Sequence, residues 1–309
     1  MTPTASSARA AFGRNTVAMP TPMNPDGSLD ELGIVEVAKH LVALGCDGII
    51  VAGTTGEAPT LDVDELVRLL QLVREGAGPD TKLTVGVGTN HTAKSVHTAQ
   101  VIAAAGADAL LVVTPYYSKP TQAGVIAHIV AIADATELPV MVYDIPGRTG
   151  LPLAYETIVE LARHPRIAAV KDAKGDLFEA MSVMAATGIS YYCGIDELNL
   201  PYLAAGASGV VSVVGAVSAD RNLALMEAID VGDLAAARAI NDEVRPLTLA
   251  LMKTAPGAVT AKAALREIGV IGHAAVRSPM LELADADVAV VREALINDGQ
   301  PVRDRLLAV

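Results

Sequence analysis

The sequence predicts an α/β fold of the (β/α)8 or TIM-barrel class, with a helical extension at its C-terminal end. Short runs of β-branched and apolar residues recur about every thirty residues, and each is followed by a turn and a longer helical pattern. No Gly-x-Gly-x-x-Gly follows the first run, which disfavours a doubly wound open sheet. The 309 residues exceed the roughly 250 that such a barrel takes, which leaves room for an appendage.

The apolar runs are expected to form eight strands of one parallel sheet, because both faces of each run are apolar. The expected strands are 16–19, 48–52, 83–87, 109–114, 139–143, 167–171, 191–194 and 209–213. Helices between them are expected at 30–44, 62–75, 92–104, 122–135 and 153–162, several of them opened by a capping residue and closed by glycine.

The two ends of the chain differ from this repeat. Residues 1–14 are rich in Ala, Ser and Thr without the apolar stretch of a signal peptide, so we expect a loose tail. We assign residues 1–230 to the barrel and 231–309 to the extension, with helices at 233–253, 259–268 and 284–298. The uncharged stretch 198–219 contains Pro201 and two periodicities, which favours a short helix and a buried strand over a membrane span.

Charge and cysteine content exclude several classes of partner. The formal net charge is -12, from 23 Lys and Arg against 35 Asp and Glu, and no basic cluster interrupts it. This balance repels nucleic acid and anionic membranes. Cys46 and Cys193 form neither a disulfide framework nor a zinc-site spacing, which favours the cytoplasm.

Lys171 is the sharpest candidate for chemistry. Working residues of a TIM barrel lie where strands end, and Lys171 ends the apolar run 167–170. Burial disfavours the charged form of a lysine and leaves a neutral amine able to attack a ketone. The alternatives are that Lys171 pairs with Asp172 or extends to water. The rival Lys174 follows in a loop with a glycine, where we expect it to be solvated.

Hydroxyl groups form a second signal at the same predicted rim. Three of the seven tyrosines, Tyr116, Tyr117 and Tyr143, fall at strand ends, and Thr54 and Thr55 follow the second strand. Phenols and hydroxyls can pass protons, although each tyrosine could equally serve only in packing.

Charged groups at the rim suggest how a substrate is held. Arg148 is a candidate clamp for a carboxylate, with a solvated loop arginine as the alternative. Asp144 and Glu57 are candidate acids or bases, and Glu57 could instead serve a helix dipole. The histidines assemble no predicted metal site, and the loops after strands seven and eight lack a phosphate-binding glycine run.

Four segments in this order resemble the dihydrodipicolinate synthase family of Schiff-base aldolases, in its actinobacterial branch. Residues 53–57, 115–120, 143–149 and 170–173 read GTTGE, PYYSKP, YDIPGRT and VKDA. The resemblance implies that pyruvate forms an imine on Lys171 and that the derived enamine attacks L-aspartate 4-semialdehyde. The product enters lysine and diaminopimelate synthesis, and no metal or cofactor is needed.

The same resemblance implies roles for further residues and an assembly. Thr54, Tyr143 and Tyr117 would form a proton relay, with Tyr117 entering the site of a neighbouring subunit of a homotetramer, a dimer of dimers. Thr55 would hold the pyruvyl carboxylate and Arg148 the carboxylate of the semialdehyde. Gly194 and Val211 would line the pocket through backbone groups. Ile195 stands where many relatives have an acid, so the resemblance implies no carboxylate role there.

Two related activities and one regulatory property remain to be compared. N-acetylneuraminate lyase or a 2-keto-3-deoxy sugar acid aldolase would use Lys171 and Tyr143 in the same way, but Arg148 has less purpose there. A non-catalytic ligand-binding barrel is a third reading. In family members inhibited by lysine, a carboxylate and a histidine meet the effector. This chain has Lys94 and Leu66 at those positions, while Asn90 and Tyr116 remain, which implies insensitivity to lysine.

Overall fold

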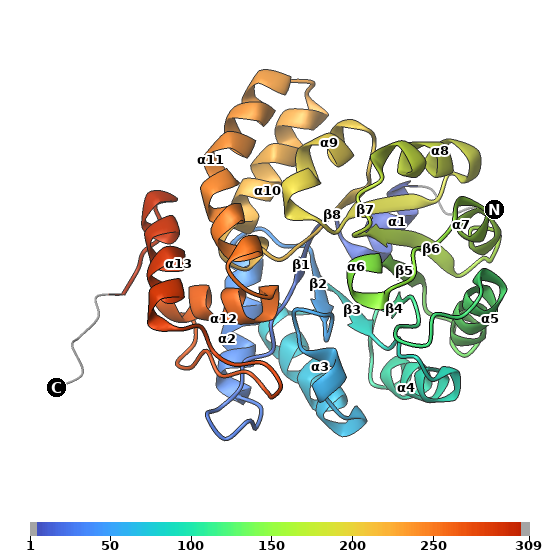
Figure 1. The fold of residues 1–309 in the computed structure, drawn as a ribbon, viewed down its shortest axis with the longest axis horizontal. Coiled ribbons are helices and arrows are strands. Elements are labelled where there is room, and N and C mark those ends of the chain that lie inside the picture. The colour runs from blue at the N-terminus through green and yellow to red at the C-terminus, as the bar shows by residue number, and fades with distance from the viewer. Residues whose placement is uncertain (1–4, 304–309) are drawn as a thin grey trace.

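Eight parallel strands close into a barrel in the computed structural model, which describes residues 5–303 and their side chains from residue 8 onward. Each strand pairs with its neighbours in sequence, and β8 pairs with β1 (Figure 1). The strands are β1 (Asn15–Ala18), β2 (Gly48–Val51), β3 (Lys82–Gly86), β4 (Ala109–Val113), β5 (Val140–Asp144), β6 (Ile167–Asp172), β7 (Ser190–Cys193) and β8 (Gly209–Ser212).

Helices surround the barrel and continue beyond it. They are α1 (Ala5–Phe12), α2 (Glu31–Ala43), α3 (Val63–Ala77), α4 (Thr92–Ala104), α5 (Gln122–Ala133), α6 (Pro146–Thr149), α7 (Tyr155–Leu161), α8 (Leu177–Thr187), α9 (Asn199–Ala204), α10 (Gly215–Asp230), α11 (Leu234–Lys253), α12 (Gly257–Ile268) and α13 (Asp285–Asn297), with 3-10 turns η1 (Ala58–Thr60) and η2 (Asp196–Leu198).

The predicted barrel is confirmed, and every strand begins and ends close to its expected bounds. Local chemistry explains the helix starts. At the start of α3, the Asp62 side chain accepts from the Glu65 backbone N–H, and the Glu65 carboxylate accepts from the Asp62 backbone N–H. Together the two bonds form a complete capping box. Within the stretch 198–219, α9 and β8 form as predicted, and its last residues begin α10. None of the described helices is long and apolar enough to cross a membrane.

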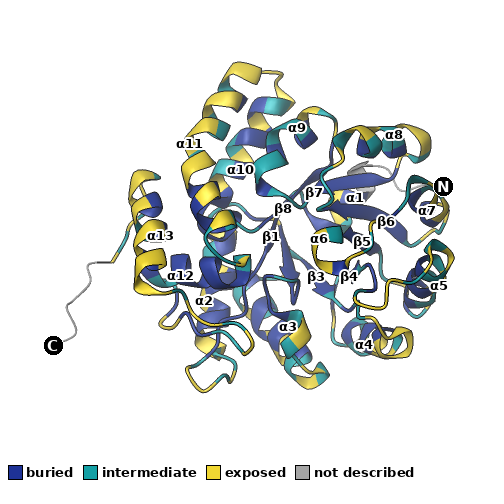
Figure 2. Ribbon diagram, viewed as in Figure 1, coloured by how far each residue is buried: buried dark blue, intermediate teal, exposed yellow. Residues whose placement is uncertain are grey.

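Two cores result from the alternation of side chains along the strands. One fills the space between strands and helices, and Figure 2 shows the strands as almost wholly buried. The other fills the barrel interior, where small residues such as Ala18 and Ala169 make room for Tyr192. A Cβ at Gly209 would lie 2.9 Å from Cε1 of Tyr192, so glycine there is part of the same fit.

Helix α1 closes the N-terminal end of the barrel. Ala8 and Phe12, one helical turn apart, are fully buried, and the Phe12 ring meets Tyr192 edge-on at 6.1 Å. The Tyr192 hydroxyl donates to the Gly13 carbonyl at 2.8 Å. The expected loose tail is therefore wrong for residues 5–14, because these apolar side chains cover the barrel floor. Residues 1–4 lie outside the described part.

Helices α11, α12 and α13 form the predicted C-terminal extension beside the barrel (Figure 1). The outer faces of α11 and α13 are exposed, whereas α12 is buried over nearly its whole length (Figure 2). Burial of α12 places the extension directly against the barrel. The division of the chain after residue 230 stays a prediction.

Candidate active site

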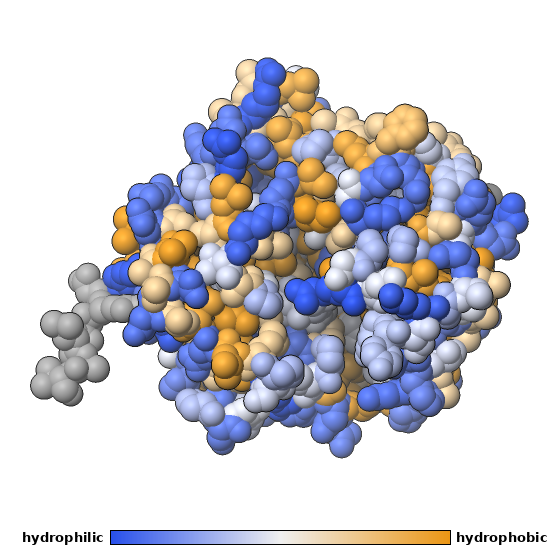
Figure 3. Space-filling view, in the orientation of Figure 1, coloured by the Kyte–Doolittle hydropathy of each residue, from blue (hydrophilic) through white to orange (hydrophobic). Residues whose placement is uncertain are grey.

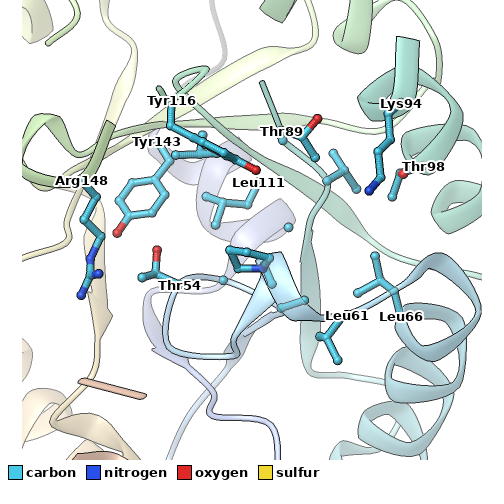
Figure 4. Close-up of a pocket in the computed structure, with 18 of the residues that line it drawn as sticks. Thr54, Leu61, Leu66, Thr89, Lys94, Thr98, Leu111, Tyr116, Tyr143 and Arg148 are labelled. Carbon is cyan, nitrogen blue, oxygen red and sulfur yellow. The ribbon is translucent and has the colours of Figure 1, made fainter. Parts of the chain in front are cut away.

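A cavity of about 320 Å³ opens at the C-terminal ends of β2 to β5. Figure 3 shows the molecular face around it, which is hollowed near its centre. Thr54, Tyr143 and Arg148 belong to the cavity wall, and Figure 4 shows their polar ends turned toward one another. Three predicted site residues are thus brought together, one from the loop after β2 and two from β5 and the segment that follows it, as expected for a barrel of this class.

Lys171 lies beside this group on the strand next to Tyr143. The two residues are register partners on β5 and β6, and the Lys171 Nζ lies 4.0 Å from the centroid of the Tyr143 ring. Lys171 is only 3% exposed, and no ion pair among the described residues includes it. A Cβ at Gly194 would lie 3.1 Å from Cε and Cγ of Lys171, so Gly194 leaves space for the lysine.

Asp172 faces the opposite side of the strand and is not the partner of Lys171. Its Oδ2 accepts from the Tyr202 hydroxyl at 2.8 Å, and its Oδ1 accepts from the Lys174 backbone N–H at 2.8 Å. Successive side chains of a strand point to opposite faces, which separates the two neighbours. The alternative that Lys171 pairs with Asp172 is therefore wrong.

Lys174 is held by protein groups, and the expectation that it is solvated is wrong. Its Nζ pairs with Glu179, donates to the Leu153 carbonyl at 3.1 Å and lies 3.9 Å from Asp144. Asp144 is 1% exposed, and both of its oxygens accept from the Leu153 N–H. Burial raises the pKa of Asp144 to about 7, against the opposing effect of Lys174. Asp144 thus faces away from the cavity and fixes the end of the loop that carries Arg148.

Glu57, the other candidate acid or base, is also turned away from the cavity. Its carboxylate pairs with Lys262 of α12 and accepts from the Arg277 backbone N–H at 2.9 Å. Our reading of the sequence missed both partners. The sequence did offer one signal for this pair: Lys262 is the only charged residue in the run 258–265, which is otherwise made of small and apolar residues. A lysine in such a run is buried only when its charge is paired.

Of the remaining predicted residues, Tyr116 lies on the cavity wall, whereas Thr55, Val211 and Tyr117 do not. Thr55 is buried, and Val211 belongs to the barrel interior. Tyr116 lines the cavity, whereas the next residue, Tyr117, is 88% exposed and has a φ of 68°. The described chain therefore does not bring Tyr117 to Tyr143 and Thr54.

The opposite side of the rim is closed by a buried carboxylate. Asp196 pairs with the Ser212 hydroxyl and accepts from the Val213 N–H at 2.8 Å, and burial raises its pKa. These bonds tie the β7 loop to the end of β8. Within residues 5–303, no group of three His, Cys, Asp or Glu residues is placed to hold a metal ion.

The cavity extends away from Arg148 toward helices α3 and α4. Leu66 of α3 and Lys94 of α4 line this far end, together with Leu61 and Thr98 (Figure 4). Tyr116 lies between the two ends (Figure 4). The two positions that the resemblance singled out for lysine recognition therefore share one space with the predicted catalytic group.

Comparison with known proteins agrees with this arrangement. The model of the dihydrodipicolinate synthetase family matches residues 11–297. The 4-hydroxy-tetrahydrodipicolinate synthase of Corynebacterium aurimucosum is 49% identical, with 93% of each chain covered, and that of Kineococcus radiotolerans is 46% identical, covering 96% of this chain and 97% of its own. A crystal structure of the Cyanidioschyzon merolae enzyme, described as having lysine bound, is 37% identical with a TM-score of 0.90, over 94% of this chain and 99% of that one. A variant described as the first monomeric dihydrodipicolinate synthase is 31% identical with a TM-score of 0.89, over 94% of this chain and 98% of that one. The chain belongs to the dihydrodipicolinate synthetase family.

Proposed function

We propose that this chain condenses pyruvate with L-aspartate 4-semialdehyde to give 4-hydroxy-tetrahydrodipicolinate, a step of lysine and diaminopimelate biosynthesis. The observation that carries the proposal is the buried Lys171 amine 4.0 Å from the Tyr143 ring, beside the cavity that Arg148 and Thr54 line. Membership of the family supports the same reaction. The sugar-acid aldolase and ligand-binding readings account less well for Arg148.

The proposed chemistry begins with attack of the Lys171 amine on the keto carbon of pyruvate. A carbon–nitrogen bond forms, and a proton delivered by the hydroxyl relay lets the keto oxygen leave as water, which gives a protonated imine. That imine accepts electron density when a methyl proton is removed, so the enamine forms without a metal or cofactor. The enamine carbon then bonds to the aldehyde carbon of the semialdehyde, and the aldehyde oxygen takes up a proton. The amino group of the semialdehyde finally attacks the imine carbon, which closes the ring and releases Lys171 as the free amine.

The other site residues receive supporting roles in this proposal. Tyr143, Thr54 and Tyr117 relay protons, because each carries a hydroxyl that both donates and accepts. Thr55 holds the pyruvyl carboxylate, and Arg148 holds the carboxylate of the semialdehyde. Gly194 and Val211 line the site through backbone groups.

The proposal includes a homotetramer built as a dimer of dimers. Tyr117 supports it, since the relay needs a phenol that this chain presents to the outside. We place the enzyme in the cytoplasm, in keeping with two free, buried cysteines. Neither nucleic acid nor membrane is proposed as a partner, given the net charge of -12.

Borohydride trapping tests the proposed function. Incubation with pyruvate and borohydride should reduce the imine to a stable adduct on Lys171, which peptide mass spectrometry locates. Lys171→Ala should abolish the adduct, while the matched Lys174→Ala variant should retain it. An unchanged adduct in Lys171→Ala would defeat the assignment.

Substrate comparison separates the proposed function from its alternatives. The native protein should turn over aspartate semialdehyde with pyruvate far faster than it cleaves sialic acid or keto-deoxy sugar acids. The reverse preference would favour an aldolase of the sugar-acid type. Absence of any adduct and of any turnover would leave a ligand-binding barrel.

A further inference from the structure

A fully buried ion pair joins the C-terminal extension to the barrel next to the proposed active site. Glu57 follows β2, and Lys262 lies in the middle of α12, and neither side chain is exposed. The Lys262 Nζ bonds to Glu57 Oε1 and donates to the Ala275 carbonyl at 2.7 Å. Glu57 Oε2 accepts from the Arg277 N–H at 2.9 Å. Both charges are therefore compensated entirely by groups of the extension and the loop.

Glu57 ends the tight turn that carries Thr54 and Thr55. Its backbone N–H donates to the Thr54 carbonyl at 3.2 Å, and the Gly56 N–H donates to Gly53 at 3.1 Å. Glu57 itself has a φ of 58°, in the left-handed region that a residue with a Cβ seldom adopts. Such a conformation persists only where surrounding contacts determine it, and here the buried carboxylate supplies those contacts.

The extension holds the same loop at a second point. The Arg277 guanidinium donates to the Thr60 carbonyl at 2.6 Å and to Glu65 of the α3 capping box at 2.7 Å. The segment after α12 therefore bonds to residues on both sides of η1, through the Arg277 backbone N–H to Glu57 and the Arg277 guanidinium to Glu65. Thr54 and Thr55 lie three and two residues before Glu57, so the bonds that hold Glu57 also hold the turn that contains them.

Stability alone is a weak explanation of such a pair. Charges removed from water lose hydration, and replacement of a buried pair by apolar residues is often neutral or stabilising. Burial indeed lowers the pKa of Lys262, and Glu57 opposes that effect. An interaction with this cost is better explained by the geometry that it fixes at the Thr54 turn.

We propose that Lys262 is a positioning residue, which acts through Glu57 to set the turn that presents Thr54 and Thr55 to pyruvate. The inference rests on the proposed function, since it assigns these threonines to the substrate. It gives the C-terminal extension a part in the active site of its own chain.

A matched pair of lysine substitutions tests the proposal in the full-length protein. Lys262→Met removes the buried charge. Lys253→Met is the control, because Lys253 also reaches from the extension to a barrel glutamate, Glu197, at 2.6 Å but with 65% of its side chain exposed. We expect Lys262→Met to raise the KM for pyruvate at least tenfold and to slow borohydride trapping on Lys171. Lys253→Met should stay within twofold of the native protein in both measurements.

A double variant separates positioning from stability. Glu57→Gln with Lys262→Met leaves no uncompensated buried charge, so its melting temperature should recover relative to Lys262→Met alone. If the pair positions the turn, the KM for pyruvate stays elevated in the double variant although the melting temperature recovers. Recovery of both together would overturn the proposal, as would native KM and trapping in Lys262→Met. A native protein that forms no pyruvate adduct would instead defeat the proposed function.

Discussion

The β2–α3 and β4–α5 loops lie at the same rim of the barrel but are held in different ways. All four described non-glycine residues with positive φ belong to these two loops: Ala52 and Glu57 in the first, Tyr117 and Lys119 in the second. In the first loop, the buried Glu57 carboxylate is bonded to Lys262 and Arg277. In the second, Tyr117 is 88% exposed.

This difference between the two loops bears on the proposed relay, because one chain holds Thr54 in place by its own contacts but does not hold Tyr117. Strained backbone persists where surrounding structure determines it. Contacts within the chain do this for the loop of Thr54. In the loop of Tyr117, Thr114 at its β4 end donates a buried bond to the Tyr143 carbonyl, but no side-chain hydrogen bond among the described residues holds Tyr117 or Lys119. In the proposed homotetramer, a neighbouring subunit would hold Tyr117.

Substitution of Tyr117 gives the largest expected effect on this comparison. Tyr117→Phe removes the hydroxyl of the proposed relay, and loss of a positioned proton-transfer group typically costs about 10²–10⁴-fold in rate. We expect a loss of kcat in this range with pyruvate trapping retained. Steady-state kinetics and borohydride trapping measure the two effects.

Mixing two inactive variants tests whether Tyr117 crosses between subunits. Lys171→Ala and Tyr117→Phe chains, once exchanged, should regain activity, since some sites then combine an intact lysine with an intact tyrosine. Failure after confirmed subunit exchange would place Tyr117 in the site of its own chain. A fully active monomer at the assay concentration would contradict the proposed assembly.

The loop of Arg148 is held from within like the first loop, but by a carboxylate that burial makes costly to ionise. The pKa of Asp144 is raised from 3.8 to about 7, so between these values the folded protein keeps a proton that the unfolded chain has lost. The resulting stability is complete below about pH 4 and is lost as the pH rises through 7. Asp144→Asn keeps an acceptor for Leu153 and should be more stable than the native protein above pH 7, by at most about 4 kcal/mol.

Unfolding in urea at several pH values measures this difference. The gain of Asp144→Asn over the native protein should grow between pH 4 and 7 and then level off. The surface variant Asp80→Asn, at an exposed position, serves as the control. A gain that does not vary with pH would mean that Asp144 is ionised throughout.

Arg148 itself should have a smaller and more selective effect. Its loop is anchored by Asp144 and Lys174 while its side chain extends to the cavity. Arg148→Ala loses a charge-assisted pair worth about 1.5–3 kcal/mol, so we expect roughly a 10- to 150-fold loss in kcat/KM for the semialdehyde. Imine trapping should change little, and Arg163→Ala, at an exposed position, should match the native protein. Equal damage to both steps would mean that Arg148 supports the site as a whole.

The sequence was sufficient for the barrel because strand and helix periodicity are local properties. Four site residues were predictable for the same reason, since each lies near the end of a strand or in the loop that follows it: Lys171, Tyr143, Thr54 and Arg148. Contacts between distant segments were not predictable in this way. Lys262 and Glu57 are 205 residues apart in the sequence, and Phe12 contacts Tyr192 from a helix outside the barrel strands. No local sequence pattern predicts either contact. Lys174 was misread because a nearby glycine suggests an open loop, whereas Asp144 and Glu179 bury its charge.

The smallest expected effect is that of free lysine on activity, and it concerns the end of the cavity between α3 and α4. Lys94 and Leu66 line this end, where an effector ammonium would face a second ammonium in place of a carboxylate. Like charges about 4 Å apart repel by roughly 4 kcal/mol at an effective dielectric constant near 20, before salt screens them. Half of that repulsion lowers affinity about thirtyfold.

We therefore expect no inhibition across a lysine titration at saturating pyruvate. Lys94→Glu alone should gain little, because Leu66 offers no hydrogen bond, whereas Lys94→Glu with Leu66→His should gain measurable inhibition. Strong inhibition of the native protein would show that other residues of this cavity recognise lysine.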